Sequence, residues 1–226
     1  MMHVAVIPDG NRRWARSRGL SLEEGYEAGI KKFAEFVKWS IELGITEITG
    51  WGMSYDNYRN RDREVLDSIK RIVNKYYEET KNRKDEIMTT YPILKDINLK
   101  VYGYFEELTD EEREYIELIN NQLNGEKYKV NILLFYNGRI EILSAVRKLV
   151  NSEKIDLDSL EKNLMLKSKP DIIIRTGGRI RTSGFLPIQS EYSEWFFLEK
   201  LWPDFTREDY IKILNEFQTR ERNFGR

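Results

Sequence analysis

The sequence predicts an α/β protein with a mostly parallel central sheet of about six strands flanked by helices. Short runs of apolar and β-branched residues alternate with longer stretches in which apolar residues recur at helical spacing. Strands separated by helices of ten or more residues require crossover connections, which favour a parallel sheet covered on both faces. The 226 residues, 40% of them hydrophobic, can form one domain with a sizeable core.

Six segments are predicted to be strands. The first is a compact apolar run, HVAVI, which is ended by the turn residues Pro8, Asp9 and Gly10. The run YKVNILLFY is apolar enough for a strand that is buried on both faces. The predicted strands cover residues 3–7, 46–53, 98–104, 128–136, 171–174 and 195–198.

The predicted helices show amphipathic patterns and end signals. In the first, Ile30, Phe33 and Val37 recur at helical spacing, and Gly44 can cap the end. The segment from residue 62 to about 90 is either one long charged helix or a pair of helices. The predicted helices cover residues 21–43, 62–90, 109–123, 140–150 and 207–222.

Composition excludes several classes of function. The chain has 37 basic and 38 acidic residues, so its net charge of −1 creates no overall field that would recruit nucleic acid. It has no cysteine, which excludes disulfides, thiolate nucleophiles and cysteine zinc sites. Its single histidine, His3, excludes sites that need two imidazoles. The sequence shows neither a transmembrane stretch nor a signal peptide, and we expect a cytoplasmic protein.

The residues after the first predicted strand are candidates for an anion site, because ligands of parallel sheets bind beyond the carboxyl ends of the strands. Gly10 and Asn11, just before a helix, can direct backbone N–H groups toward an anion. Arg12 and Arg13 can add charge-assisted hydrogen bonds to phosphate oxygens. Two roles stay open for Asp9. It could cap the turn or form an ion pair, or it could be a ligand of a Mg²⁺ ion whose other ligands include substrate phosphates.

The segment after the fifth predicted strand has a similar character. Residues 175–184 contain a glycine pair flanked by arginines and hydroxyl groups. Ten of the nineteen arginines lie in the windows 11–18, 59–63 and 175–181, whereas a solvated face would not concentrate arginine over lysine at strand ends. This distribution favours a site for two diphosphate groups, without the glycine-rich fingerprints of nucleotide-binding proteins.

The aromatic residues suggest an apolar pocket beside these anion sites. Aromatic residues make up 12% of the chain, and core packing explains most of them. Phe33, Phe36 and Trp39 of the first long helix could also form the wall of a pocket. A ligand with a charged head and an apolar tail would use both features.

Several blocks of sequence resemble the cis-prenyltransferases, the undecaprenyl diphosphate and dehydrodolichyl diphosphate synthases. The blocks run in family order and cover essentially the whole chain, which indicates a single domain over residues 1–226. The long block RTGG, followed about 25 residues later by LWPDF, is the most specific. The blocks are HVAVIPDGNRRWAR, SYDNY, YNGR, DIIIRTGGRIRTSGFLPIQSEYSEWFFLEKLWPDF and FQTRERNFG.

The resemblance implies a fold like that of undecaprenyl diphosphate synthase, with a hydrophobic tunnel and a homodimeric or heterodimeric assembly, of which a homodimer is expected here. It implies an enzyme that joins isopentenyl diphosphate to an allylic prenyl diphosphate in the presence of Mg²⁺. The product would be a cis-polyprenyl diphosphate, the precursor of a lipid carrier, and peripheral contact with a membrane could serve its release. Nucleic acid is not an expected partner.

The resemblance also implies roles for individual residues. Asp9 would be the catalytic and magnesium-binding aspartate, Glu194 the second acid at the metal, and Gly225 the glycine that reaches the partner's site. Asn57 and Ser54 match a motif near the reacting carbons, with Asn57 counted as catalytic. Residues expected to bind the allylic diphosphate are Gly10, Asn11, Arg12, Arg13 and Trp14. Residues expected to bind isopentenyl diphosphate are Arg175, Arg181 and Ser183.

Five positions depart from the family pattern, and they lie around the phosphate motifs. Tyr26 and Leu22 replace a histidine and an arginine after the first motif, and Asn60 stands where an arginine is usual. Arg179 and Ile180 replace an acid and a histidine after RTGG. The changed charges concern the identity of the allylic primer more than catalysis.

Two alternatives to ordinary elongation remain open at this point. One is a non-catalytic subunit that binds isoprenoid diphosphates or stabilises a catalytic partner. The other is an enzyme of the same fold with an unusual substrate or coupling geometry. Asp9 favours an enzyme, because non-catalytic relatives typically lose the aspartate of the first motif.

Overall fold

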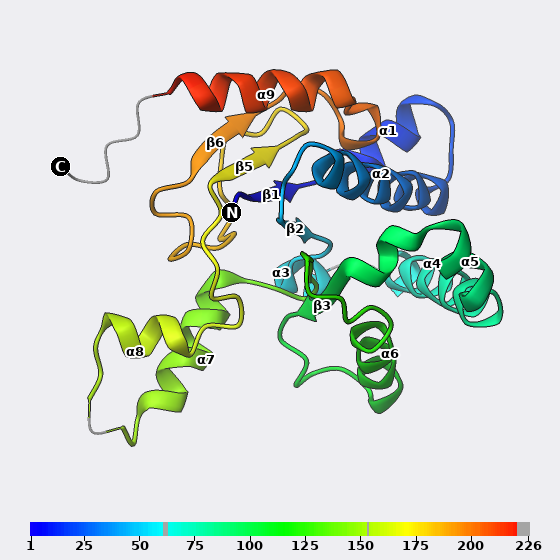
Figure 1. The fold of residues 1–226 in the computed structure, drawn as a ribbon. Helices are drawn as coiled ribbons and strands as arrows, with labels where there is room; N and C mark the ends of the chain where they lie inside the picture. Colours follow the sequence, from blue (N-terminus) through cyan, green and yellow to red (C-terminus); the bar gives the residue numbers. More distant parts are fainter. Residues whose placement is uncertain (61–62, 153, 221–226) are drawn as a thin grey trace.

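A computed structural model describes residues 1–60, 63–152 and 154–220 (Figure 1). Its sheet has six strands in the order β3-β4-β2-β1-β5-β6, and every pairing between them is parallel. The predicted fold class, a largely parallel six-stranded sheet flanked by helices, is therefore confirmed. The strands are β1 His3–Ile7, β2 Glu47–Trp51, β3 Ile97–Tyr102, β4 Tyr128–Leu133, β5 Ile172–Arg175 and β6 Glu194–Phe197.

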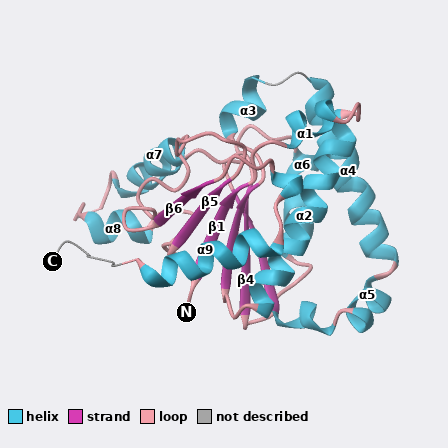
Figure 2. Ribbon diagram, turned by 90° about the horizontal axis from the view of Figure 1, so that it is seen from above, coloured by secondary structure: helices cyan, strands magenta, loops and turns pink. Residues whose placement is uncertain are grey.

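Helices cover both faces of this sheet (Figure 2). Helix α9 crosses one face, α7 and α8 lie on the β6 side, and α2, α4 and α6 lie toward the other edge (Figures 1 and 2). The helices are α1 Asn11–Ser17, α2 Leu22–Glu42, α3 Tyr55–Asn60, α4 Arg63–Asn82, α5 Lys84–Thr90, η1 Pro92–Asp96, α6 Asp110–Asn120, α7 Gly138–Leu149, α8 Leu157–Lys162, η2 Trp202–Asp204 and α9 Arg207–Thr219.

The predicted elements are present, with differences at their ends. β4 ends at Leu133 rather than at residue 136, because the chain turns at Phe135, whose φ is +51°. Of the predicted segment 62–90, the described residues 63–90 form α4 and α5, which is the helix pair of the two alternatives. The short helix α8 was not predicted; it begins at a capping box formed by Asp156 and Ser159.

Of the three apolar clusters in the described core, the two largest lie on opposite faces of the sheet. The alternation of β1 directs Val4 and Val6 to one face and Ala5 and Ile7 to the other. On the first face, Phe36 of α2 contacts aromatic rings of η2 and α9. The rings around it are Trp202, Phe205 and Tyr210, with centroids 5.7, 6.1 and 4.7 Å away.

Helix α1 approaches α2 closely because two glycines of α2 face it. A Cβ on Gly25 would lie 2.8 Å from the Cβ of Ala15, and one on Gly29 would lie 2.8 Å from the carboxamide of Asn11. Real Cβ atoms do not approach that closely, so side chains at these positions would push α1 away. This packing places the start of α1, and with it the loop after β1, against the edge of the sheet.

The opposite, amino end of the sheet carries a buried polar network. His3 is 5% exposed, and its Nε2 lies 2.7 Å from Oγ1 of Thr49. The carboxamide of Asn131 donates to Thr49 and to Oε1 of Glu47. The network lies at the amino end, away from the carboxyl edge of the sheet, and His3 is a structural part of it. Among the described residues, no helix combines the length and the apolarity needed to cross a membrane.

We predict that His3 makes the fold sensitive to acid. Burial lowers the pKa of His3 below its ordinary value of about 6.5, with nearby carboxylates acting in the opposite direction. The unfolded chain therefore takes up a proton that the folded chain resists. The contribution of neutral His3 to the free energy of unfolding is complete above about pH 6.5. It decreases as the pH falls below that value, by at most about 1.4 kcal/mol per pH unit.

The measurement is urea denaturation at pH 7, 6 and 5 for the wild type and for His3→Gln. Glutamine can replace the hydrogen bond of Nε2 without titrating. The free energy of unfolding of the wild type should fall more steeply with decreasing pH than that of the variant. Parallel profiles would show that His3 does not titrate on unfolding.

Candidate active site

The residues of the predicted anion site lie at the carboxyl edge of the sheet, where β1 and β5 end side by side. Ile7 pairs with Arg175, and Arg175 pairs with Phe197 of β6. Asp9 lies two residues beyond Ile7 and therefore reaches the end of β5. The structure thus brings together the two motifs that lie more than 160 residues apart in the sequence.

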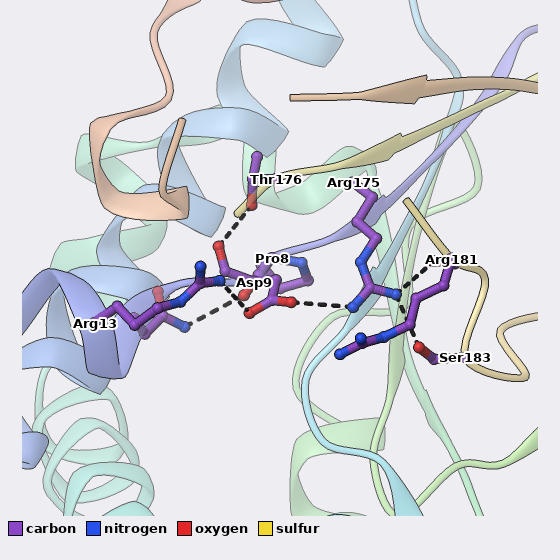
Figure 3. A network of polar contacts seen from close by, with 8 residues as sticks. Pro8, Asp9, Arg13, Arg175, Thr176, Arg181 and Ser183 are labelled. Carbon is purple, nitrogen blue, oxygen red and sulfur yellow. Dashed lines mark hydrogen bonds and ion pairs between the residues drawn. The ribbon is translucent and has the colours of Figure 1, made fainter. Parts of the chain in front are cut away.

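The carboxylate of Asp9 lies between two guanidinium groups (Figure 3). Its Oδ1 is 3.2 Å from Nη2 of Arg13, and its Oδ2 is 3.0 Å from Nη2 of Arg175. The side chain of Arg175 is 5% exposed, whereas those of Asp9 and Arg13 are 29% and 44% exposed. Burial lowers the pKa of Arg175, and the hydrogen bond and charge of Asp9 counter this effect. Thr176, which the sequence did not single out, donates to the main-chain oxygen of Asp9 at 2.9 Å.

Gly10 shapes the turn into α1. Its φ of +118° is unfavourable for other residues, and a Cβ there would lie 2.9 Å from Cδ2 of Leu201. Arg12 is exposed, like Arg13. The side chain of Asn11, in contrast, lies against α2, with its Nδ2 3.5 Å from the oxygen of Pro8. The contribution of Asn11 to an anion site would therefore come from its main chain.

Trp14 is turned toward the protein by a residue of the LWPDF block. Its indole N–H donates to Oδ1 of Asp204 at 2.7 Å, and the guanidinium of Arg18 lies 4.5 Å from the indole ring. Arg18 also pairs with Asp204 at 3.0 Å. Trp14 thus connects α1 to η2, and this contact gives it a positioning role at the site.

The loop after β5, residues 176–184, is hydrogen-bonded to Arg175; it is the second anion loop predicted from the sequence. Nη1 of Arg175 donates to the main-chain oxygen of Arg181 at 2.6 Å and to Oγ of Ser183 at 2.9 Å (Figure 3). Arg181 is exposed at this edge. The same guanidinium therefore contacts Asp9 on one side and the loop of Arg181 and Ser183 on the other.

Ser54 and Asn57 lie beyond the carboxyl end of β2, at the same edge of the sheet. Ser54 forms an isolated bridge with Tyr136, and its Oγ accepts from the main-chain N–H of Asn57 at 3.1 Å. Asn57 is exposed on α3. Because β2 is parallel to its neighbour β1, the residues that follow both strands lie at the same edge of the sheet. Ser54 and Asn57 therefore lie at the edge that carries Asp9.

The five departures from the family pattern occupy different places. Leu22 and Tyr26 are half-buried on α2, and Asn60 is exposed at the end of α3. Arg179 and Ile180 are exposed in the second anion loop, where Ile180 is 81% exposed. The loop thus presents an additional cation and an aliphatic side chain to the solvent.

A single chain does not bring Glu194 to Asp9. Glu194 pairs with Ile172 at the amino end of β6, three residues from the level of Arg175, which is about 10 Å along the strand. Its Oε2 is 2.6 Å from Nη1 of Arg220. A metal ion shared by the two acids within one chain is therefore not supported. Gly225 lies outside the described residues.

The donors at the edge are compatible with Mg²⁺ when a diphosphate is also present. Within the described part of the chain, no three acidic or histidine side chains gather as a metal cluster. Asp9, however, is a partly exposed carboxylate, and Mg²⁺ typically takes one or two carboxylates together with substrate phosphates and water. The carboxylate of Asp9 is thus the candidate ligand, with phosphate oxygens completing the coordination.

A buried glutamate that the sequence did not single out supports the second loop. Glu141 of α7 is 1% exposed. Its Oε2 accepts from the hydroxyl of Tyr136 at 2.6 Å and from Nε2 of Gln189 at 3.0 Å. Its Oε1 accepts from the main-chain N–H groups of Met165 and Leu166. Burial raises the pKa of Tyr136, so its hydroxyl stays a donor. An acidic residue two positions after the YNGR block was the available signal.

We predict that Glu141→Gln lowers the free energy of unfolding by about 2 kcal/mol, because the amide NH₂ would face donors that now bond to a carboxylate oxygen. Urea denaturation measures the loss. The matched control is Glu161→Gln on α8, whose exposed carboxylate pairs with Lys169, and which should change stability by less than about 0.5 kcal/mol. Equal effects of the two substitutions would contradict the role of Glu141.

The fold and the site define a class of protein: an α/β protein with arginines around one carboxylate at the carboxyl edge of a parallel sheet, an arrangement suited to phosphorylated ligands. Comparison with known proteins narrows this class. A family described as putative undecaprenyl diphosphate synthase matches residues 7–225. The chain belongs to this family, and it is a cis-prenyltransferase.

Individual relatives agree with the family assignment. The chain is 35% identical to a tritrans,polycis-undecaprenyl-diphosphate synthase (GGDP specific) of Sulfolobus acidocaldarius, over 99% of this chain and 87% of the relative. It is 37% identical to the geranylgeranyl-diphosphate-specific enzyme of Pyrococcus furiosus, over 99% and 86%. Among solved structures, lavandulyl diphosphate synthase from Lavandula x intermedia, in complex with dimethylallyl diphosphate, has a TM-score of 0.85 and 29% identity, covering 99% of this chain and 98% of that one.

Proposed function

We propose that the protein condenses isopentenyl diphosphate with an allylic prenyl diphosphate to make a cis-polyprenyl diphosphate, the precursor of a lipid carrier, in a reaction that requires Mg²⁺. The observation that carries the proposal is the position of Arg175. Its guanidinium contacts both Asp9 and the loop of Arg181 and Ser183. Two diphosphates bound to the two loops would therefore lie next to each other.

The residues divide between these two diphosphates. Arg12, Arg13 and the main chain at Gly10 would bind the allylic diphosphate. Arg175, Arg181 and Ser183 would bind isopentenyl diphosphate. Arginine suits this task because its planar guanidinium forms paired hydrogen bonds with phosphate oxygens.

The reaction requires charge stabilisation at the allylic diphosphate. Its C–O bond breaks, and the electron pair leaves with pyrophosphate. The double bond of isopentenyl diphosphate forms the new C–C bond to the allylic carbon, and a proton then leaves the adjacent carbon. Arg13 stabilises the negative charge that develops on the leaving group, while Ser54 and Asn57 would orient the reacting carbons. Mg²⁺ held by Asp9 and phosphate oxygens would neutralise further charge on that group.

The allylic primer and the path of the product belong to the same proposal. Two relatives carry names that state specificity for geranylgeranyl diphosphate, and we propose this primer here. The growing chain would enter an apolar tunnel, where each buried CH₂ contributes about 0.8 kcal/mol. The segments 28–41, 65–90 and 130–136 would line the tunnel. A cytoplasmic location and peripheral membrane contact for product release remain predictions.

We predict that Asp9→Asn lowers kcat at least about 100-fold, because the carboxylate that holds the metal and orients Arg13 is lost. Arg181→Gln should raise the KM for isopentenyl diphosphate about tenfold and leave the KM for geranylgeranyl diphosphate nearly unchanged. The assay measures incorporation of labelled isopentenyl diphosphate with Mg²⁺ and primers of several lengths.

The control is Arg113→Gln on α6, an exposed arginine that pairs with Asp110 outside the segments proposed to line the tunnel, and it should not affect either KM. If Arg181→Gln affected the allylic substrate alone, the two phosphate sites would be reversed. If the wild type formed no extended product with any primer, the proposed reaction would be wrong.

A second coupling geometry is favoured by one observation. The solved relative with a TM-score of 0.85 is named a lavandulyl diphosphate synthase, and its structure contains dimethylallyl diphosphate. A product built from dimethylallyl diphosphate alone would indicate the unusual coupling geometry that the sequence left open, instead of elongation with isopentenyl diphosphate. Analysis of the product by NMR distinguishes its branched skeleton from linear elongation.

We also propose that the protein is a homodimer and that α7, α8 and β6 contribute to its interface. Leu143, Val146 and Val150 form a stripe at helical spacing on α7 and its end, and they are 40% to 66% exposed. Ile155 and Leu157, just before and at the start of α8, are further exposed apolar residues, with exposed fractions of 62% and 77%. Exposed apolar patches of this kind are typical of interfaces between subunits.

The strand β6 supports the same interface. It is the last strand of the described sheet, and the rings of Trp195 and Phe197 stack at 5.6 Å beside a cavity of about 290 Å³ between β6 and α9. In Figure 2, helices α7 and α8 lie near the β6 edge of the sheet, and Figure 1 shows them on the opposite face from α9. A second copy on this side could also bring its Glu194 to a metal ion.

We predict that Val150→Asp converts the dimer to a monomer, because a charge would be buried in an apolar interface. Light scattering after size-exclusion chromatography measures the mass. Ile93→Asp is the matched control, since Ile93 is 39% exposed on η1, away from α7 and α8. A monomeric wild type would contradict the proposal.

A further inference from the structure

The turn formed by residues 181–186 has an unfavourable backbone. Ser183 and Leu186 have φ values of +54° and +46°, and Gly184 between them has +81°. For residues other than glycine, this left-handed region is unfavourable for steric reasons. Such conformations persist only where the surrounding structure holds them in place, and they concentrate at functional sites.

An aromatic side chain at the centre of the turn is held by the sheet. Phe185 is completely buried, and its ring stacks on that of Trp51, with centroids 5.1 Å apart and an angle of 28° between the planes. Its main-chain N–H donates to the oxygen of Thr182 at 3.0 Å, which closes the turn. Trp51 is the last residue of β2, so the stack connects the turn to the end of a central strand.

Trp51 itself is held in a fixed place. It is 8% exposed, and Tyr136 contacts it edge-on with centroids 6.4 Å apart. The hydroxyl of Tyr136 donates to the buried carboxylate of Glu141. Trp51 also belongs to the same apolar cluster as Ile7, the strand partner of Arg175. The stack therefore lies on the face of the sheet to which Arg175 projects.

The stacking of Trp51 on Phe185 depends on the indole ring and not on its N–H group. Nε1 of Trp51 is buried and has no hydrogen-bond partner among the described residues. A buried unpaired donor is unfavourable, so a phenyl ring would form the same stack without that cost. A large flat surface is the property that an aliphatic residue could not supply at this position.

We propose that Trp51 and Phe185 form an aromatic clamp that positions the turn 181–186 for binding a diphosphate. The turn carries the main-chain oxygen of Arg181 and the hydroxyl of Ser183, both of which bond to Arg175. Without the clamp, the strained turn relaxes and these groups separate from the guanidinium. The two aromatic residues are thus positioning residues. The inference rests on the proposed assignment of this loop to isopentenyl diphosphate.

The experiment measures the affinity of the purified full-length protein for inorganic pyrophosphate by isothermal titration calorimetry, together with the KM for each substrate. Trp51→Leu and Phe185→Leu should each weaken pyrophosphate binding at least tenfold and raise the KM for isopentenyl diphosphate more than they lower kcat. The double variant should lose no more than either single one. Trp51→Phe should stay within threefold of the wild type.

The matched control is Phe205→Leu, which removes a fully buried ring from the other face of the sheet. It should lower the melting temperature without weakening pyrophosphate binding tenfold. If Trp51→Leu does not fold, Phe185→Met tests the same contact with a smaller loss of volume.

Three results would overturn the clamp. They are equal losses of affinity in Phe205→Leu and Phe185→Leu, additive losses in the double variant, and a Trp51→Phe variant as weak as Trp51→Leu, which would indicate a role for the indole N–H. A wild type that binds no pyrophosphate would overturn both the clamp and the proposed function. If the wild type binds pyrophosphate but forms no extended product, the proposed reaction fails, and the affinities of the variants still decide on the clamp.

Discussion

The ion pair between Asp9 and Arg175 is the interaction on which the candidate site depends. A guanidinium that is 5% exposed needs a nearby carboxylate and hydrogen-bond acceptors, because an uncompensated buried charge is strongly unfavourable. The parallel register of β1 and β5 supplies the carboxylate, and the main-chain oxygen of Arg181 and the hydroxyl of Ser183 supply acceptors. One cation therefore determines where both strand-end loops lie, and their proximity follows from its burial.

The two arginines that contact Asp9 differ in freedom, and this difference bears on ligand binding. Arg175 is fixed by burial and by three partners, whereas Arg13 is 44% exposed on the first helix. An incoming diphosphate can draw Arg13 away from Asp9 with little rearrangement of the protein. Arg175 would maintain the distance between the two diphosphate sites, and Arg13 would respond to the bound ligand. Such a division suits a site in which negative charge develops on only one of two diphosphates.

The two faces of the sheet serve different purposes. On the face of Phe36, aromatic and aliphatic side chains of α2, η2 and α9 form a core whose main effect is stability. The other face combines apolar packing with a buried polar hub at Glu141, which bonds to four groups from three segments of the chain. Hydrogen bonds have fixed directions, so this hub specifies loop positions more closely than apolar contacts would. The aromatic stack of Trp51 and Phe185 lies on this face, next to the loop it would position.

The sequence by itself determined the fold class, and it predicted a site at the strand ends with roles for Asp9 and Arg175, because hydrophobic periodicity and motif chemistry are local properties of the chain. The tertiary structure decided which groups meet. It turned Asn11 and Trp14 toward the protein, revealed Glu141 and Asp204 as supports, and separated Glu194 from Asp9 along the strand. A motif shows that a residue belongs to a site, but strand register and helix packing decide the direction of its side chain, and both depend on contacts between segments far apart in the sequence.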